Sequence, residues 1–425
     1  MIENTHSNHA RAWVIHPDIK SNINKKSAEP ALKEAVALAK AMPKLDVQGS
    51  TLVPLSSPKA GMLFGKGKIE ELRGVFTDNE IELVLIDGPL TPVQQRNLEK
   101  IWSIKILDRT GLILEIFSDR AATREGVLQV EMAALTYQRT RLVRAWTHLE
   151  RQRGGLGFVG GPGETQIEAD RRAIDLQLSK LRQQLARVVK TRRLHRSSRA
   201  SIPYPIVALV GYTNAGKSTL FNQLTGAKVL AKNMLFATLD PCMRAIRTKN
   251  GKHVILSDTV GFVSDLPTEL VAAFSATLEE VLSADIILHV RDISHEANEE
   301  QAKDVSSILQ TLGVDEKIPL FEIWNKTDLL SKEEQDFILN QAKRKQDVYL
   351  LSAINGEGMG AIIDAVEGRL TSDSFEETIS LSHKEGKKRA WLYQQGVVIR
   401  EEVVETGMLL VVFWSAQQKA QFFSI

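Results

Sequence analysis

The most constraining feature of the sequence is a glycine-rich segment between a predicted strand and a predicted helix. Residues 211–218 read GYTNAGKS, which matches the pattern G-x-x-x-x-G-K-[ST]. The apolar run 206–210 before it predicts a buried strand, and residues 219–224 after it predict a helix. In this context glycines let backbone N–H groups surround phosphate oxygens, and the helix N-terminus adds partial positive charge. The segment therefore predicts an α/β fold with a site for a nucleoside triphosphate.

Two side chains of this segment have predicted chemical roles. The Lys217 ammonium supplies a full positive charge at the β- and γ-phosphates, and the Ser218 hydroxyl is a ligand for Mg²⁺. The residues expected to surround the phosphates are Gly211, Tyr212, Thr213, Asn214, Ala215, Gly216, Lys217, Ser218 and Thr219.

A second segment predicts contacts to the metal and to the γ-phosphate. Residues 254–256 predict a buried strand that leads to Asp258, Thr259, Val260 and Gly261. Asp258 can reach Mg²⁺ through a water molecule, and the Gly261 N–H can meet the γ-phosphate. Between the two segments the Thr238 hydroxyl can complete the Mg²⁺ shell; it belongs to the run Phe236, Ala237, Thr238, Leu239 and Asp240.

The third part of the pattern predicts which base is selected. The apolar run 318–324 ends at Asn325, Lys326 and Asp328. A carboxylate at Asp328 can accept hydrogen bonds from both N1–H and the exocyclic amine of guanine, and the Lys326 stem can cover the base. Adenine lacks this paired donor edge, so it would leave a buried carboxylate unpaired. The strand predicted at 348–351 leads to Ser352 and Ala353, whose backbone can meet the guanine O6.

In this order, each after a suitable strand, the segments resemble the G motifs of translation-factor-class GTPases. The resemblance implies Mg²⁺-dependent binding and hydrolysis of GTP. The residues then expected to act in hydrolysis are Lys217, Thr238 and Gly261, with Ser218 and Thr238 as the metal ligands.

Two positions depart from Ras-like switches. Phe262 stands where those proteins have a glutamine that orients the attacking water, and its side chain has no hydrogen-bonding group. We therefore expect slow intrinsic hydrolysis that a partner or a remodelled switch accelerates, although Phe262 can also serve packing alone. Asn214 resembles the P-loop asparagine of potassium-activated GTPases; a K⁺ site and a local hydrogen bond that only stabilises the loop are both open.

Composition bears on the cellular compartment. The single cysteine, Cys242, excludes an intramolecular disulfide and favours a reducing compartment. The first residues include Glu3, Arg11 and Asp18 and lack the apolar core of a secretion signal. The longest apolar stretch, 408–414, is far shorter than the ~20 residues that a membrane helix needs. We expect a cytoplasmic protein without a membrane span, and a monomer.

Periodicity divides the chain into four expected domains. Residues 1–120 alternate strand and helix patterns and predict an α/β domain with a mostly parallel sheet. Residues 121–200 predict a helical hairpin with a glycine-rich loop, and 196–205 predict a linker. Residues 205–370 hold the G motifs, and 371–425 predict a small α+β domain with strands at 397–404 and 408–414.

The predicted hairpin is strongly basic. Residues 120–200 contain 17 Arg or Lys against 7 Asp or Glu, although the whole chain has a net charge of only +2. Ile174, Leu178, Leu181, Leu185 and Val188 recur at steps of four and three residues, which predicts a coiled-coil-like seam. The charge favours a polyanionic partner, with a solvated helix face as the alternative.

Three further segments leave alternatives open. The glycine run 154–163 contains a G-x-G-x-x-G pattern but follows a predicted helix, so it fails the context of a dinucleotide site; it is a connection or a phosphate contact. Residues 65–68, GKGK, predict a turn into a helix or a phosphate cradle. Asp87, Gly88 and Pro89 predict a turn, or a ligand position at the end of a strand.

Taken together, these segments resemble the HflX GTPases. The resemblance is carried by residues 64–68 (FGKGK), 107–110 (LDRT), 113–117 (ILEIF), 154–166 and 258–262 (DTVGF). It implies binding to the large ribosomal subunit, through rRNA and ribosomal proteins, and GTP-dependent splitting of stalled or idle ribosomes. Two alternatives to ribosome splitting stay open: a GTPase that acts in subunit assembly, and an RNA-binding protein that GTP only regulates. Some family members are also reported to use ATP through the N-terminal domain; here that domain has no P-loop.

Overall fold

The N-terminal part of the chain forms a parallel sheet in the order β2-β1-β3-β4. Its strands are β1 (Ala10–Ile19), β2 (Leu45–Leu55), β3 (Leu83–Ile86) and β4 (Lys105–Asp108). The helices α1 (Ala28–Lys40), α2 (Lys66–Asp78), α3 (Pro92–Trp102) and α4 (Arg109–Arg120) alternate with them. Strand β3 is buried along its whole length, as a run of four apolar residues predicts for a strand covered on both faces. The predicted α/β layer is confirmed.

The computed structural model describes residues 9–20, 27–152, 162–199, 204–227, 235–236, 242–248, 253–264, 280–315, 317–372, 374–404 and 407–423. Within these ranges, no helix combines the length and the apolar character that crossing a membrane requires. The predicted site residues Ala237, Thr238, Leu239 and Asp240 and most of the glycine run lie outside the described residues.

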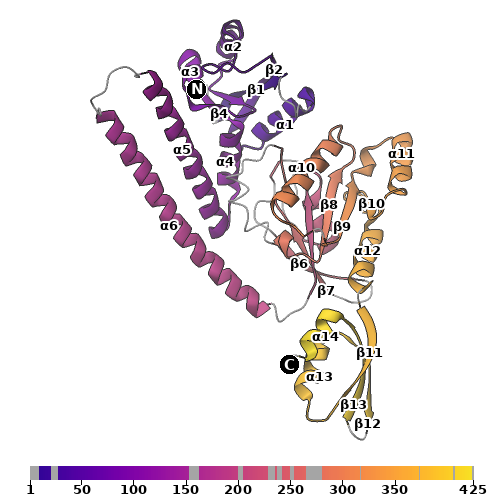
Figure 1. Ribbon diagram of the computed structural model, residues 1–425. Helices are drawn as coiled ribbons and strands as arrows, with labels where there is room; N and C mark the ends of the chain where they lie inside the picture. The colour runs from indigo at the N-terminus through magenta and orange to yellow at the C-terminus, as the bar shows by residue number, and fades with distance from the viewer. Residues whose placement is uncertain are drawn as a thin grey trace, which may run out of the picture.

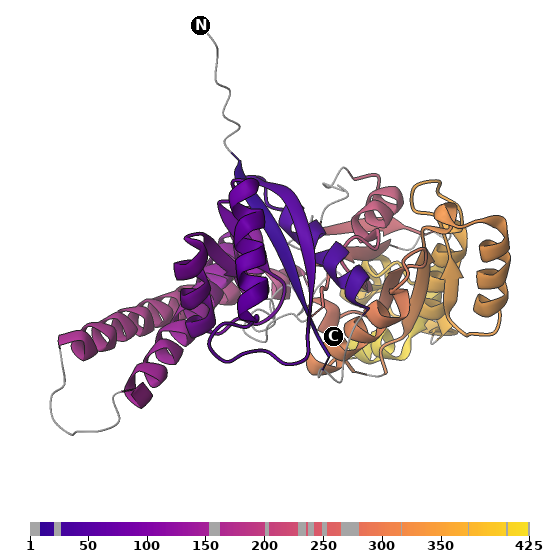
Figure 2. The ribbon, with the colours of Figure 1, turned by 90° about the horizontal axis from the view of Figure 1, so that it is seen from above.

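Two long helices follow, α5 (Arg124–Gln152) and α6 (Pro162–Arg199), and they lie side by side as an arm that projects from the rest of the molecule (Figures 1 and 2). The predicted seam residues Ile174, Leu178, Leu181, Leu185 and Val188 are buried or half-buried, while most residues between them are exposed. The predicted hairpin is therefore confirmed. The linker predicted from residue 196 is wrong at its start, because α6 continues to Arg199; two serines weaken a helix only slightly, whereas proline, first met at Pro203, breaks it.

Leu178 offers a direct test of this seam. Its side chain is 2% exposed, so Leu178→Ala is expected to lower the free energy of unfolding by about 2–4 kcal/mol. Leu176 on the same helix is 63% exposed and is the matched control, for which a change within about 0.5 kcal/mol is expected. Urea unfolding followed by far-ultraviolet circular dichroism measures both variants. Equal losses would contradict the packing of the two helices.

The second sheet has six strands in the order β10-β9-β8-β5-β7-β6, and all neighbours are parallel except β6 and β7. The strands are β5 (Ile206–Gly211), β6 (Cys242–Arg247), β7 (His253–Asp258), β8 (Ile286–Asp292), β9 (Leu320–Asn325) and β10 (Val348–Leu350). The described helices beside them are α7 (Lys217–Thr225), α10 (Asn298–Thr311), α11 (Lys332–Ala342) and α12 (Met359–Ser372), with a 3₁₀ turn, η1, at Thr327–Leu329. The predicted strand–P-loop–helix order is confirmed.

One face of this second sheet shares its core with the N-terminal elements. Ala208 and Val210 of β5 belong to the same buried cluster as Leu38 of α1 and Ile113 of α4. In that cluster Phe117 of α4 packs edge-on against Phe236, with ring centroids 4.6 Å apart. The opposite face packs against α7 and α12 as a separate cluster. Apolar side chains therefore join the two sheets directly.

The C-terminal part forms a three-stranded antiparallel sheet in the order β11-β13-β12. Its elements are β11 (Ser374–Leu381), α13 (Gly386–Gln394), β12 (Val398–Val404), β13 (Gly407–Ser415) and α14 (Ala416–Phe423). The predicted pair of strands is confirmed, and β11 is an addition that the sequence did not indicate. This sheet has a core of its own and lies beyond α12 in Figure 1.

Candidate nucleotide site

The predicted site residues gather at one edge of the six-stranded sheet. Strands β5, β7, β8 and β9 run parallel and end at Gly211, Asp258, Asp292 and Asn325. Parallel strands bring their carboxyl ends to the same edge, where open α/β sheets bind ligands.

The conformation of the P-loop requires glycine at two positions. Gly211 has φ +153°, and a Cβ there would lie 2.2 Å from the carbonyl oxygen of Val290. Gly216 has φ +98° and precedes helix α7, and a Cβ there would lie 2.2 Å from Nδ2 of Asn325. Side chains at either position would push the loop away from its neighbouring strand. The backbone amides at the start of α7 therefore stay open to an anion.

Lys217 is buried with an ammonium that has capacity for a further partner. Its Nζ donates to the carbonyl oxygens of Gly211 at 3.0 Å and Tyr212 at 2.8 Å. An ammonium has three N–H donors, so one is left over among the described residues. Burial lowers the pKa of Lys217 to about 8, although the charge of Asp258 acts in the opposite direction. The negative charge of a phosphate beside this ammonium would raise the pKa again and favour the protonated form.

Ser218 and Asp258 form the part of the predicted metal site that the structure describes. The Ser218 hydroxyl donates to Oδ2 of Asp258 at 2.7 Å, and Asp258 is fully buried at the end of β7. A hydroxyl and a carboxylate are the oxygen ligands that Mg²⁺ prefers, with the remaining positions filled by water and phosphate. The donor set therefore fits the ion.

The segment after β7 lies directly against the P-loop. The N–H of Phe262 donates to the Gly211 carbonyl at 3.1 Å, and the N–H of Thr213 donates to the Phe262 carbonyl at 2.7 Å. A Cβ on Gly261 would lie 3.1 Å from Nζ of Lys217, so this backbone stands beside the ammonium. The Phe262 side chain is 3% exposed and packs in the shared core. It therefore serves packing in this conformation and offers no group to a water molecule.

At the base end, one amide links three of the predicted segments. The buried Asn325 donates from Nδ2 to the Ala215 carbonyl at 2.8 Å and accepts from the Ala353 N–H at 2.9 Å. The Ser352 hydroxyl donates to Oδ1 of Asp328 at 2.6 Å, which orients that half-buried carboxylate. Segments that are distant in sequence are thus held in one site.

One residue at the base-binding end of the site, Asp292, was not predicted from the sequence. Asp292, at the end of β8, pairs through Oδ2 with Nζ of Lys326 at 2.7 Å, and both side chains are largely shielded from solvent. Its only sequence indication is a carboxylate directly after a buried strand. The pair holds the Lys326 stem that we expect over the base.

Asp292→Asn is expected to weaken GDP binding by about threefold to tenfold, because losing a partly buried ion pair is worth roughly 1 kcal/mol. Isothermal titration calorimetry measures the affinity. Asp336→Asn on the exposed face of α11 is the matched control and is expected to bind GDP as tightly as the parent protein. An unchanged affinity in Asp292→Asn would mean that Lys326 needs no anchor.

Three further candidate positions differ in their surroundings. Asp87 forms a buried ion pair with Arg109 and a hydrogen bond with Nδ1 of His16, so its carboxylate is occupied within the protein. Gly65 precedes the first residue of α2, in keeping with a turn into a helix. Asn214 has φ +61° and is exposed, and its side chain has no hydrogen bond among the described residues.

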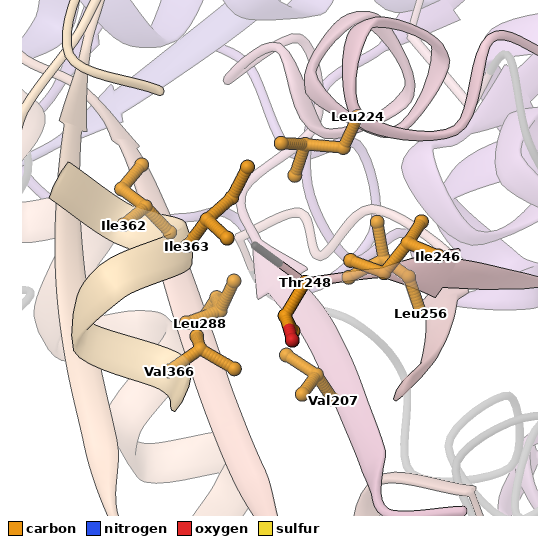
Figure 3. Close-up of a pocket in the computed structure, with 9 residues that line it drawn as sticks. All are labelled: Val207, Leu224, Ile246, Thr248, Leu256, Leu288, Ile362, Ile363 and Val366. Carbon is orange, nitrogen blue, oxygen red and sulfur yellow. The ribbon is translucent and has the colours of Figure 1, made fainter. Parts of the chain in front are cut away.

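A separate cavity beside the six-stranded sheet has a mostly apolar lining, unlike the nucleotide site (Figure 3). It lies between the sheet, α7 and α12 and is lined by Val207, Leu224, Ile246, Thr248, Leu256, Leu288, Ile362, Ile363 and Val366. Thr248 is the one polar residue in this lining, and its hydroxyl donates to Glu367 at 3.1 Å. The cavity therefore lacks groups that could recognise a nucleotide.

The fold and the site define a P-loop GTPase, a hydrolase that acts on GTP. Four family models match the chain. They are described as GTP-binding GTPase N-terminal (residues 29–118), GTP-binding GTPase Middle Region (120–199), 50S ribosome-binding GTPase (206–326) and HflX C-terminal domain (337–422). The chain belongs to the HflX family of GTPases.

The similarity to individual relatives extends over most of the chain. It is 47% identical to the GTPase HflX of Magnetococcus marinus over 368 residues, which cover 87% of this chain and 84% of the relative. It is 42% identical to the GTPase HflX of Escherichia coli K12, with 83% and 82% covered. A GTP-binding protein from Sulfolobus solfataricus in complex with GDP matches with a TM-score of 0.44 and 23% identity, covering 85% of this chain and 99% of that one.

Proposed function

We propose that this protein binds the large ribosomal subunit and uses GTP to separate the subunits of stalled or idle ribosomes. The observation that carries the proposal is a set of six exposed basic side chains along the projecting helix α6: Arg171, Arg172, Lys180, Arg182, Arg187 and Lys190. Lysine and arginine held on a rigid helix can contact successive RNA phosphates. The description of the family that matches residues 206–326, a 50S ribosome-binding GTPase, supports the same partner. Such a protein would work in the cytoplasm, as a monomer on rRNA and ribosomal proteins.

In this proposal different residues of the site contact the phosphates, the base and the metal ion of bound GTP. Lys217 stabilises charge on the transferring phosphoryl group, and the Gly261 N–H contacts the γ-phosphate. Asn325 and Asp328 select guanine, and the backbone at Ser352 and Ala353 meets its O6. Ser218 would hold Mg²⁺ together with Thr238; bound there, the ion neutralises charge on the β- and γ-phosphates.

A monovalent cation is a second component of the proposal. Asn214 is an exposed residue of the P-loop, and its side chain has no hydrogen bond to any described residue, which leaves its carbonyl oxygen available to K⁺ beside the phosphates. Hydrolysis measured in equimolar KCl and NaCl tests this role. A faster rate in KCl is expected, and equal rates would remove potassium from the mechanism.

The first experiment is co-sedimentation with separated ribosomal subunits in a GTP analogue, GDP and no nucleotide. We expect retention on the large subunit that is strongest with the analogue. A variant with Lys180, Arg182, Arg187 and Lys190 changed to glutamine should lose retention at physiological salt. The matched control changes four exposed basic residues elsewhere, Lys303, Lys332, Lys343 and Arg344, and should sediment as the parent does.

A second experiment separates splitting from other ribosomal roles. Intact ribosomes are incubated with the protein and GTP and resolved on sucrose gradients, and a shift from ribosomes to subunits is expected. Binding confined to immature particles, with mature ribosomes intact, would instead indicate subunit assembly. Equal RNA binding with GTP and with GDP, without splitting, would indicate an RNA-binding protein and overturn the proposal.

A further inference from the structure

The P-loop contains a buried hydroxyl group that the contacts described above do not explain. Thr213 is 6% exposed, and its Oγ1 is buried without a hydrogen-bond partner among the described residues. It is the only hydroxyl of this kind in the described part of the chain. A buried polar group normally has a partner, because leaving it unbonded costs the free energy of removing it from water. The Thr213 hydroxyl therefore requires a partner that the described residues do not supply.

Comparable hydroxyl groups in the six-stranded sheet are bonded. Thr259, directly after β7, is fully buried and donates to the Leu209 carbonyl oxygen at 2.6 Å. Thr248, directly after β6, is 5% exposed and donates to Glu367 at 3.1 Å. The unbonded hydroxyl of Thr213 is thus a property of the P-loop and not of buried threonines in this sheet.

The Thr213 side chain borders the place where the γ-phosphate is expected. A Cβ on Gly261 would lie 2.8 Å from Cγ2 of Thr213 and 3.1 Å from Nζ of Lys217, so both side chains stand beside the same backbone. Oγ1 and Cγ2 of Thr213 are attached to one carbon, which puts the hydroxyl next to this point as well. Lys217 is shielded to the same extent, at 6% exposed. A γ-phosphate that contacts Lys217 and Gly261 therefore comes close to the Thr213 hydroxyl.

Two features hold this hydroxyl in position. The N–H of Thr213 donates to the Phe262 carbonyl oxygen at 2.7 Å, which fixes the backbone. Threonine is branched at Cβ, so its χ1 angle has few accessible values. A hydroxyl held in this way can stabilise charge on a reacting group without first being ordered.

The chemistry of the neighbouring residue makes such a group useful. The buried phenyl ring of Phe262 offers no hydrogen bond to the groups that react in GTP hydrolysis. The Thr213 hydroxyl, in contrast, has one O–H donor and two acceptor lone pairs. It can therefore supply a polar contact that Phe262 cannot.

We propose that the Thr213 hydroxyl donates a hydrogen bond to the γ-phosphoryl group of GTP, either in the bound state or while that group is transferred to water. GDP has no γ-phosphate, so the contact distinguishes GTP from GDP. The inference rests on the placement of the γ-phosphate beside Lys217 and Gly261 in the function proposed above, and it is independent of the ribosomal partner.

Thr213→Val tests the contact, because it removes the hydroxyl and keeps the branched shape. We expect the single-turnover rate of GTP hydrolysis, the affinity for a non-hydrolysable GTP analogue, or both to fall by about tenfold or more, the scale of one hydrogen bond to a charged group. The affinity for GDP should stay within twofold. Thr213→Ser keeps a hydroxyl and should recover most of the loss.

Thr248→Val is the matched control, because it also removes a buried threonine hydroxyl but lies at the apolar cavity of Figure 3, outside the nucleotide site. It should hydrolyse GTP as the parent does and unfold at a lower temperature, since it leaves Glu367 without its partner. Thr213→Val removes an unbonded group, so the nucleotide-free variant should unfold at a temperature higher by roughly 2 °C. A lowered unfolding temperature would mean that this hydroxyl already has a partner in the protein, which would overturn the inference.

Unchanged hydrolysis together with unchanged affinity for the analogue in folded Thr213→Val would also overturn it. So would equal losses of affinity for GDP and for the analogue, which would indicate a distorted loop. If Thr213→Val does not fold, Thr213→Ala takes its place. Lys217→Ala, measured alongside, tests the placement of the γ-phosphate separately. Near-normal hydrolysis by Lys217→Ala would contradict that placement, whereas its loss beside normal hydrolysis by Thr213→Val would reject the Thr213 contact alone.

Discussion

Replacing Asp328 by asparagine is expected to exchange guanine for xanthine as the preferred base. The carboxylate can accept from both N1–H and the exocyclic amine of guanine, whereas asparagine keeps one acceptor and turns a donor toward that amine. One hydrogen bond is then replaced by a donor–donor contact and the other loses its charge assistance, so GDP affinity should fall by roughly 100-fold or more. Xanthine carries an oxygen in place of the amine, which the new donor satisfies.

The structure makes Asp328→Asn a clean substitution. The Ser352 hydroxyl, which donates to Oδ1 of Asp328 at 2.6 Å, can donate equally to the amide oxygen of asparagine, so the side chain should keep its orientation. Calorimetric titration with GDP and xanthosine diphosphate measures the exchange, with Asp336→Asn as the control. Retained guanine preference would contradict the assignment of Asp328. So would ATP binding to the parent protein as tightly as GTP.

Lys217→Ala is expected to lower kcat for GTP hydrolysis by roughly 10²–10³-fold, the usual effect of removing one preorganised electrostatic partner of a transition state. The buried ammonium stands beside Gly261, where the γ-phosphate is expected, and no other described lysine or arginine is bonded to the P-loop carbonyls that hold it. Single-turnover hydrolysis at saturating GTP measures the chemical step separately from weakened binding.

The fold should survive Lys217→Ala. Because burial lowers the pKa of Lys217 to about 8, the folded protein disfavours its charged form, and removing the ammonium relieves that burden. An unchanged or raised unfolding temperature is therefore expected together with the loss of activity. Lys303→Ala on the exposed face of α10 is the control. Near-normal hydrolysis by a folded Lys217→Ala protein would exclude the assigned role.

Sequence alone predicts those parts of the site in which a short motif directly follows an apolar strand. The segments at Gly211, Asp258 and Asn325 each follow an apolar run, and parallel strands necessarily bring such strand ends together. The hydrogen bonds of Asn325 with Ala215 and Ala353 join segments that follow different strands, as this arrangement predicts.

The contact between Glu34 and Ser264 could not be predicted from the sequence, for a physical reason. Glu34 and Ser264 are 230 positions apart and meet only because one face of each sheet packs into the same core. No periodicity or spacing encodes such a contact. The Asp292–Lys326 pair was also not predicted. An aspartate after a strand has many possible partners, and the sequence does not show which of them it meets.

The separate core of the C-terminal sheet has a practical consequence. Its buried residues all lie between Ile379 and Phe422, so none of them contributes to the apolar interior of the other two sheets. A shortened chain that stops at residue 372 would keep every member of those two apolar clusters. That boundary is therefore a suitable place to attach a fluorescent reporter or to exchange the appended sheet for that of a relative.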